Sequence, residues 1–314
     1  MRAGQSSWMA ARVTLPSGLG GGPFSVDRAL SLGVGVGRLR GTDLERPFWG
    51  VRVPVGSVRS LLDRVNAYAE RMSPGAFFSH ITAARLWGIP LPLALQGRSG
   101  LDVAVVPGRI VPVGAGVRGH RLQVDERDLL QFGRIRIISL ARTWCDLGAL
   151  LSEEDLVAAG DFLLWRRRAD HLRLTRRDLG DALDRWKGRR GRLVLERCLP
   201  TLTDRADSPP ESKIRVRFAF AGLPSPEVNC EIYTEAGVFV AMTDLGWRKY
   251  RVAFDYEGDG HRTDRVQWGK DLKRAPRIEN ANWSYVRAGA PDLRDSREII
   301  EILKHKLRKG GWRG

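Results

Sequence analysis

Cysteine is scarce in this chain of 314 residues, which contains only Cys145, Cys198 and Cys230. These three are far apart and never form a Cys-x-x-Cys pair, so neither a disulfide framework nor a zinc site is expected. Each is expected to be a small core residue. Long apolar runs are missing too, since none reaches the roughly 18 residues that cross a bilayer, and the first residues lack a secretory signal pattern. The chain is therefore expected to be cytoplasmic, without membrane contact.

Several catalytic motifs are also missing. The sequence has no GxxxxGK[ST] phosphate loop, no GxSxG and no HExxH. The glycine-rich run 33–37 follows a helical pattern and not a strand, so a dinucleotide site is not expected there. These absences argue against P-loop nucleotide hydrolysis, serine hydrolysis of the α/β-hydrolase kind and zinc-dependent proteolysis.

Acidic residues are outnumbered: 36 Asp and Glu stand against 52 Lys and Arg, for a net charge of +16. Such an excess indicates a polyanion as partner, and nucleic acid, most simply DNA, is the expected one. The excess is concentrated between Leu164 and Arg192, where Arg166, Arg167 and Arg168 are the predicted phosphate contacts. The alternative is that this stretch is only a solvated helix face.

Carboxylates gather near the C-terminal end of the chain. The run 252–256 has the apolar and aromatic bias of a buried strand, and alternation places Asp255 and Glu257 on one face of it. A second strand-like run, 238–243, ends at Asp244. Two strands joined by a turn are therefore predicted, with an acidic face.

The expected turn suggests how these acids meet. If the chain reverses over residues 249–252, an antiparallel register places Asp244 directly across from Glu257. Two carboxylates so placed repel unless a divalent cation lies between them, and Mg²⁺ or Mn²⁺ takes such oxygen ligands. Asp259 is a further candidate ligand. A slip of one residue in the register would separate the pair.

A third acid, Glu211, lies at the start of a predicted helix. Ser208 followed three residues later by glutamate is the pattern of a capping box, and the helix is expected to run through Ile214 and Phe218. The spacing of Glu211 from these two residues places it on the inward-facing stripe. Two interpretations stay open: Glu211 only closes the capping box, or it also belongs to a site with Asp244 and Glu257.

These features resemble the restriction-endonuclease-like superfamily, in its very-short-patch-repair-like branch. The resemblance rests on the helix with Glu211, the hairpin with Asp244 and the run Glu257-Gly258-Asp259-Gly260-His261-Arg262, and covers Ser208 to Leu307. It implies metal-dependent phosphodiester hydrolysis, with Asp244, Glu257 and Asp259 as metal ligands. Glu211 would tune the metal site from behind these ligands, and His261 would act as general acid or base. Arg262 and Lys270 are the expected nucleic-acid contacts beside this site. Asp259 occupies the position where the superfamily usually has lysine.

The N-terminal half contains a different unit. Ser25 is expected to cap a helix that ends at Gly33, followed by a short helix over 36–44 and a strand over 48–53. This pattern resembles a truncated winged helix in which Arg38, Arg40 and Arg46 approach DNA. Together with residues 57–164 it resembles the antitoxin proteins of abortive-infection (AbiEi-type) systems, which implies promoter binding.

The sequence therefore predicts an α+β multidomain protein. The expected parts are a disordered tail (1–23), a winged-helix-like DNA-binding unit (24–56), a mixed α/β region with the basic segment (57–204) and a restriction-endonuclease-like α/β domain (205–314). The expected function is that of a metal-dependent nuclease in phage defence or DNA repair. The alternative is a non-enzymatic transcriptional regulator or antitoxin whose nuclease-like domain is catalytically dead, an interpretation that Asp259 at the lysine position favours.

Overall fold

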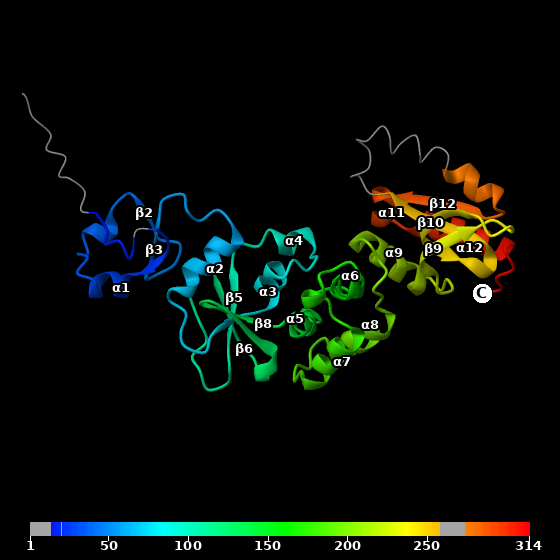
Figure 1. The fold of residues 1–314 in the computed structure, drawn as a ribbon. Helices are drawn as coiled ribbons and strands as arrows, with labels where there is room; N and C mark the ends of the chain where they lie inside the picture. Colours follow the sequence, from blue (N-terminus) through cyan, green and yellow to red (C-terminus); the bar gives the residue numbers. More distant parts are fainter. Residues whose placement is uncertain (1–13, 20, 258–273) are drawn as a thin grey trace, which may run out of the picture. The chain divides into compact units, whose positions relative to one another are not determined.

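A computed structural model describes residues 14–19, 21–257 and 274–314 of the chain. These residues form a mixed α/β structure with three β-sheets, and they divide into two compact units (Figure 1). Unit 1 comprises residues 1–86 and 98–138, and unit 2 comprises residues 87–97 and 139–314. No helix among the described residues combines the length and the apolar character needed to cross a membrane.

Unit 1 begins with a three-stranded sheet of order β1-β3-β2. Its elements are β1 (Phe24–Ser25), α1 (Val26–Ser31), the 3₁₀ turn η1 (Arg38–Arg40), β2 (Leu44–Glu45) and β3 (Val51–Pro54). The expected first helix is confirmed, since the Ser25 side chain accepts a hydrogen bond from the backbone N–H of Arg28 at 3.2 Å. The expected second helix over 36–44 is wrong, because only the turn η1 forms there. Glycine lowers helix stability by roughly 1 kcal/mol per residue, and this run contains Gly37 and Gly41.

The second sheet of unit 1 has five strands in the order β6-β5-β4-β8-β7. The elements of this part are α2 (Leu61–Ala69), β4 (Phe77–Phe78), α3 (His80–Leu86), β5 (Leu101–Val105), β6 (Val117–Arg121), η2 (Glu126–Asp128), β7 (Leu129–Phe132) and β8 (Ile135–Ile138). Every residue of β4 and β5 is buried, as expected for central strands covered on both faces.

The first part of unit 2 is helical. It consists of α4 (Leu93–Gln96), α5 (Leu140–Leu147), α6 (Glu153–Leu164), η3 (Asp170–Leu172), α7 (Arg176–Arg185), α8 (Arg192–Cys198), η4 (Leu199–Thr201) and α9 (Pro209–Phe220). Cys145, Cys198 and Cys230 are all buried, as predicted for small core residues. A buried ion pair joins α6 to α9: the carboxylate of Asp161 accepts hydrogen bonds from Arg215 and Ser212, both at 2.7 Å. This contact fixes α9 on the helical part.

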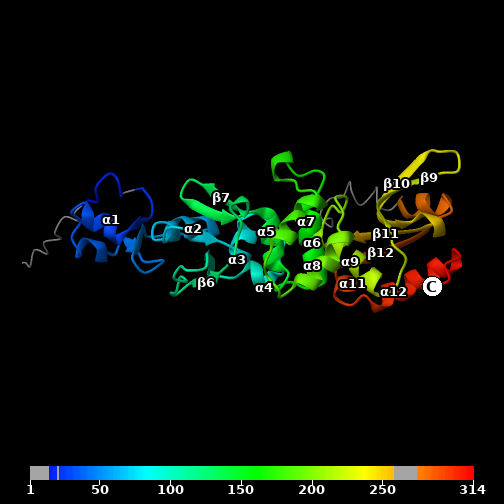
Figure 2. The same ribbon diagram turned by 90° about the horizontal axis from the view of Figure 1, so that it is seen from below.

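The second part of unit 2 is a four-stranded sheet of order β12-β11-β10-β9 with helices against it (Figures 1 and 2). Its elements are β9 (Glu227–Tyr233), β10 (Phe239–Trp247), η5 (Arg248–Tyr250), β11 (Val252–Glu257), β12 (Ser284–Gly289), α11 (Ala290–Arg294) and α12 (Arg297–Lys309), and residues 274–280 are helical. On one face, Phe254 and Val286 pack with residues of α9 and α12. On the other, Ala253 and Tyr285 pack around Ile278.

Candidate functional site

The strands β10 and β11 meet at a pair of aspartates. The antiparallel ladder pairs Trp247 with Val252 and Leu245 with Phe254, and beyond that point side chains replace backbone partners. The backbone N–H of Asp244 donates to Oδ1 of Asp255 at 2.9 Å, and the backbone N–H of Tyr256 donates to Oδ2 of Asp244 at 2.7 Å. Each carboxylate therefore accepts a hydrogen bond from a backbone N–H of the neighbouring strand.

This pairing corrects the register expected from the sequence. Asp244 was expected directly across from Glu257, but the ladder from Leu245↔Phe254 brings Asp255 beside it instead. The expected turn lay one residue too late in the chain, which moves the partner of Asp244 by two residues. Because the shift is of two residues and strand faces alternate with a period of two, the acidic face itself is preserved.

Asp255 is buried and has two further partners. The hydroxyl of Tyr285 donates to Oδ2 at 2.5 Å, and Nε of Arg274 donates to the same oxygen at 2.9 Å. Arg274 also donates to the backbone carbonyl of Met242. Burial and the negative charge of Asp255 raise the pKa of the Tyr285 hydroxyl, so this phenol stays protonated as a donor. The guanidinium supplies the positive charge that a buried carboxylate requires.

Glu211 lies in the first turn of α9 and is 8% exposed. The Ser208 hydroxyl donates to its Oε1 at 2.6 Å and the backbone N–H of Asp207 donates to its Oε2 at 3.0 Å. Its carboxylate therefore does take part in the capping of the helix. Burial raises the pKa of Glu211, and the charges of Asp207 and Asp255 raise it further against these hydrogen bonds.

The charges of Glu211 and Asp255 affect the pKa of Asp244. The pKa of Asp244 rises to about 7, first because the carboxyl is buried and then because Glu211 and Asp255 lie near it. The backbone N–H of Tyr256 and the charge of Arg274 oppose this rise. Near neutral pH the protonated and ionised forms of Asp244 are therefore present in comparable amounts, and an added cation would favour the ionised form.

The structure places the other predicted site residues as follows. Glu257 is the last residue of β11, its side chain is 53% exposed, and it pairs with Arg287 at 2.8 Å. Asp259, His261, Arg262 and Lys270 lie outside the described residues. Within the described ranges, no three His, Cys, Asp or Glu side chains form a ready-made metal-binding group.

The basic segment after α6 borders this cluster through Asp207. Its carboxylate accepts hydrogen bonds from Nε1 of Trp165 at 2.9 Å and from the side-chain amide of Asn229 at 3.2 Å, and a guanidinium nitrogen of Arg167 lies 3.6 Å away. Since Asp207 also contacts Glu211, the segment and the acids are neighbours in unit 2.

The predicted phosphate contacts of this segment differ in their surroundings. Arg167 is 57% exposed at its side chain. Arg168 instead lies over the Phe162 ring, 4.4 Å from its centroid, and donates to the carbonyls of Leu172 and Trp87. Arg166 is half-buried, and its backbone N–H donates to the Asp204 carbonyl. Arg167 is therefore the most accessible of the three guanidinium groups.

In unit 1 the predicted DNA contacts also differ in their exposure to solvent. Arg38 makes a two-pronged ion pair with Asp43, at 3.0 and 2.7 Å, and its side chain is 11% exposed. Arg40 is exposed at the end of η1. Arg38 is thus engaged in an ion pair within unit 1, whereas Arg40 faces solvent.

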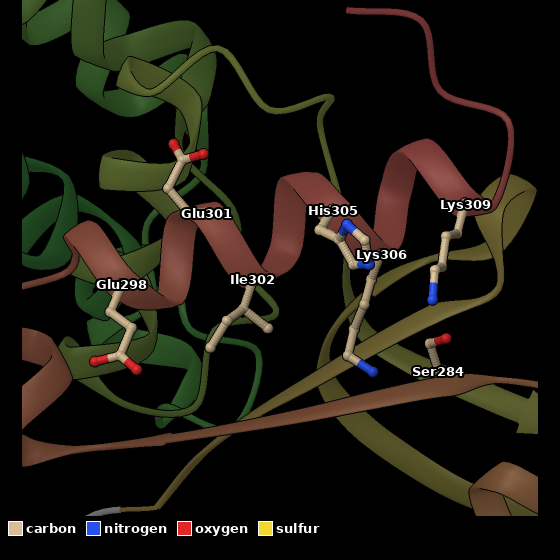
Figure 3. A pocket seen from close by; sticks show the side chains of 7 residues that line it. All are labelled: Ser284, Glu298, Glu301, Ile302, His305, Lys306 and Lys309. Atoms are coloured by element: carbon tan, nitrogen blue, oxygen red, sulfur yellow. The ribbon is translucent and has the colours of Figure 1, made fainter.

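A pocket of about 570 Å³ lies along α12 (Figure 3). Its lining is Ser284, Glu298, Glu301, Ile302, His305, Lys306 and Lys309. The side of β11 that α12 covers carries Phe254, whereas Asp255 points to the opposite face with Ala253. The pocket is therefore not part of the acidic cluster.

Sequence reasoning missed Arg274 and Tyr285. Neither stands in a motif: they are 19 and 30 residues from Asp255, and only the fold brings them to it. Asp255 itself had a usable signal, since alternation placed it on the acidic face of the strand.

Comparison with known proteins yields uncharacterised relatives. Two proteins of Mycobacterium tuberculosis, one from strain CDC 1551 / Oshkosh and one from strain H37Rv, are each 28% identical to this chain over 136 residues. The match covers 43% of this chain and 50% of each relative, so the chain spans half the length of these proteins. No family model matches the chain. No solved structure matches it either.

Proposed function

We propose that the sheet of unit 2 and its helices form a metal-dependent nuclease domain that hydrolyses phosphodiester bonds of DNA. The observation that carries this proposal is the meeting of Glu211, Asp244 and Asp255, with the pKa of Asp244 raised to about 7. Buried acids that raise one another's pKa favour the binding of a further positive charge, and a divalent cation would supply it.

The residues present suit a hard divalent cation. Asp244 and Glu211 offer carboxylate oxygens, the ligand type that Mg²⁺ and Mn²⁺ prefer. Glu257, the last residue of β11, and Asp259 stay predicted ligands. Such a cation, when bound, supplies Lewis acidity at the phosphate and lowers the pKa of water. Asp255 is committed to Arg274 and Tyr285 and orders the strand ends instead.

The protein's own side chains would do the remaining work. Asp244 must lose its proton before it can act as a ligand, and Glu211 would orient it from the helix start. His261 is proposed to transfer a proton to or from the reacting oxygens. Arg167 would contact the phosphate backbone beside the acids, with Arg166, Arg262 and Lys270 as further proposed contacts.

Unit 1 is proposed to contribute DNA affinity in the manner of a winged helix. A three-stranded sheet with α1 and η1 against it, and Arg40 exposed at the end of η1, supports this assignment. The wider proposal is a role in phage defence or DNA repair in the cytoplasm.

A regulator or antitoxin without catalytic activity is the second candidate. The observation that favours it is Arg274, whose guanidinium already neutralises Asp255 without any metal. A cluster balanced in this way can serve as structure alone.

Cleavage assays separate the two candidates. The full chain is incubated with single-stranded, duplex, mismatched and nicked DNA in Mg²⁺, Mn²⁺ or EDTA, beside Asp244→Ala and Glu257→Ala variants. The nuclease predicts metal-dependent cutting that Asp244→Ala abolishes. Tight DNA binding without cutting of any substrate under any metal would leave the regulator as the answer.

A further inference from the structure

Trp49 is the starting point of a separate inference about unit 1. Its side chain is 84% exposed, although the flanking residues Phe48 and Val51 are 3% and 0% exposed. Gly50 between them has φ +72°, a left-handed conformation that glycine adopts without cost. The buried neighbours and this turn hold the indole outward. A single exposed apolar residue is common and by itself indicates nothing, so the surroundings of Trp49 decide its meaning.

The indole carries an arginine beside it. The guanidinium carbon of Arg71 lies 5.4 Å from the centroid of the Trp49 ring and 5.8 Å from that of Tyr68. Tyr68 is 4% exposed and is fixed by an edge-to-face contact with Phe48, 5.0 Å between centroids. The rings of Trp49 and buried Tyr68 therefore orient Arg71. Its charge is available to a ligand that stacks on Trp49.

The neighbouring charges are positive. Arg46 is exposed, and its charge adds to burial in lowering the pKa of Arg52, which donates to the carbonyls of Leu39 and Val51. The acids of this region are committed elsewhere: Asp43 to Arg38, Glu45 to the backbone N–H of Gly56, and Glu70 to Arg134. The described residues of unit 1 hold 16 arginines against nine acidic residues. A polyanion fits this surface better than an apolar protein face does.

We propose that Trp49 stacks an unpaired nucleobase of a single-stranded nucleic acid, while Arg46 and Arg71 contact the adjoining phosphates. The inference rests on the proposed nucleic-acid binding and adds the form of the ligand and the residue that reads it. An indole face suits any base, and flanking cations follow the backbone, which together are the features of single-strand binding surfaces. A fully paired duplex offers no free base face to Trp49.

The test is fluorescence-anisotropy titration of the full chain with a labelled single-stranded oligonucleotide and with the duplex of the same sequence. Trp49→Ala should weaken single-strand binding roughly 5- to 150-fold, the range expected for one stacked base. Trp49→Phe should retain most of the affinity. The salt dependence should stay unchanged in Trp49→Ala, whereas Arg46→Ala and Arg71→Ala should each lower its log-log slope by roughly 0.7.

Two controls test whether a loss of affinity in Trp49→Ala is specific to this residue and not caused by unfolding. Phe132→Ala removes another exposed aromatic side chain of unit 1, 56% exposed, and should leave affinity unchanged. Thermal melting should show that Trp49→Ala is folded, as expected for so exposed a residue. If the wild type binds no nucleic acid, the proposed function and this inference both fall. If it binds but Trp49→Ala changes nothing, or weakens duplex and single strand equally, the stacking inference alone is overturned.

Discussion

The backbone N–H of Asp244 donates to the carboxylate of Asp255, 2.9 Å away, at the point where the β10–β11 ladder stops. The two acids thus do more than share a face: one orders the main chain of the other, while their charges repel. The pKa of Asp244 rises to about 7, first because the carboxyl is buried and then because of the charges of Glu211 and Asp255.

The first prediction concerns stability against pH. An acid whose pKa is higher in the folded state than in the unfolded one binds more protons when folded, so the free energy of unfolding falls as the pH rises from about 4 through about 7. Asp244→Asn keeps an oxygen for the Tyr256 N–H but cannot ionise. The wild type should lose roughly 2–4 kcal/mol more than Asp244→Asn over this interval, measured by urea unfolding at each pH. Parallel curves for the two proteins would refute the raised pKa.

The second prediction concerns metal. Mg²⁺ or Mn²⁺ should raise the melting temperature of the wild type relative to EDTA, because a ligand that binds only the folded state stabilises it by mass action. Asp244→Asn should lose this shift. A matched control is Glu235→Gln, an exposed acid whose removal should preserve the shift. Equal melting temperatures in metal and EDTA would count against the cation site.

The third prediction concerns Arg274. Arg274→Gln removes the charge that balances Asp255 and should destabilise the metal-free protein by about 1–3 kcal/mol, the usual cost of an unpaired buried polar group. If a cation and this guanidinium relieve the same negative charge, Mg²⁺ should restore more stability to the variant than it adds to the wild type. Thermal melting with and without metal measures both quantities, and an identical metal effect in the two proteins would show that they are independent.

The fourth prediction separates two neighbouring arginines. Arg167→Ala should weaken DNA binding and lower the log-log salt slope by roughly 0.9 for duplex, since it removes one phosphate contact, with little change in melting temperature. Arg168→Ala should mainly lower the melting temperature, because that side chain lies over Phe162 and donates to two carbonyls. Binding that is insensitive to Arg167→Ala would place the phosphate contacts elsewhere.

The fifth prediction concerns His261 and the chemistry. If the domain is a nuclease, His261→Ala should reduce turnover roughly a hundred- to ten-thousand-fold while DNA affinity stays the same, as expected for a proton-transferring group that acts in the transition state. Single-turnover cleavage and anisotropy binding measure the two effects. A parallel loss of affinity and turnover would mean that His261 only binds substrate.

Local sequence was enough for the helix starts and for the acidic strand face. Ser25 and Ser208 cap their helices as their patterns predict, because the serine side chain accepts a hydrogen bond from a backbone N–H only three residues along the chain. Asp244 and Asp255 lie on one face for the same kind of reason, since strand alternation is a property of the backbone.

Tertiary structure alone decided which acid meets Asp244 and what balances it. Register depends on where the turn over residues 248–251 tightens, which the strand pattern cannot distinguish from a shift of two residues. Arg274 and Tyr285 reach Asp255 across separations of 19 and 30 residues, through the packing of a helix and the parallel pairing of β12 with β11. The raised pKa of Asp244 follows from that assembly, because burial and neighbouring charge exist only once the sheet and α9 are in place.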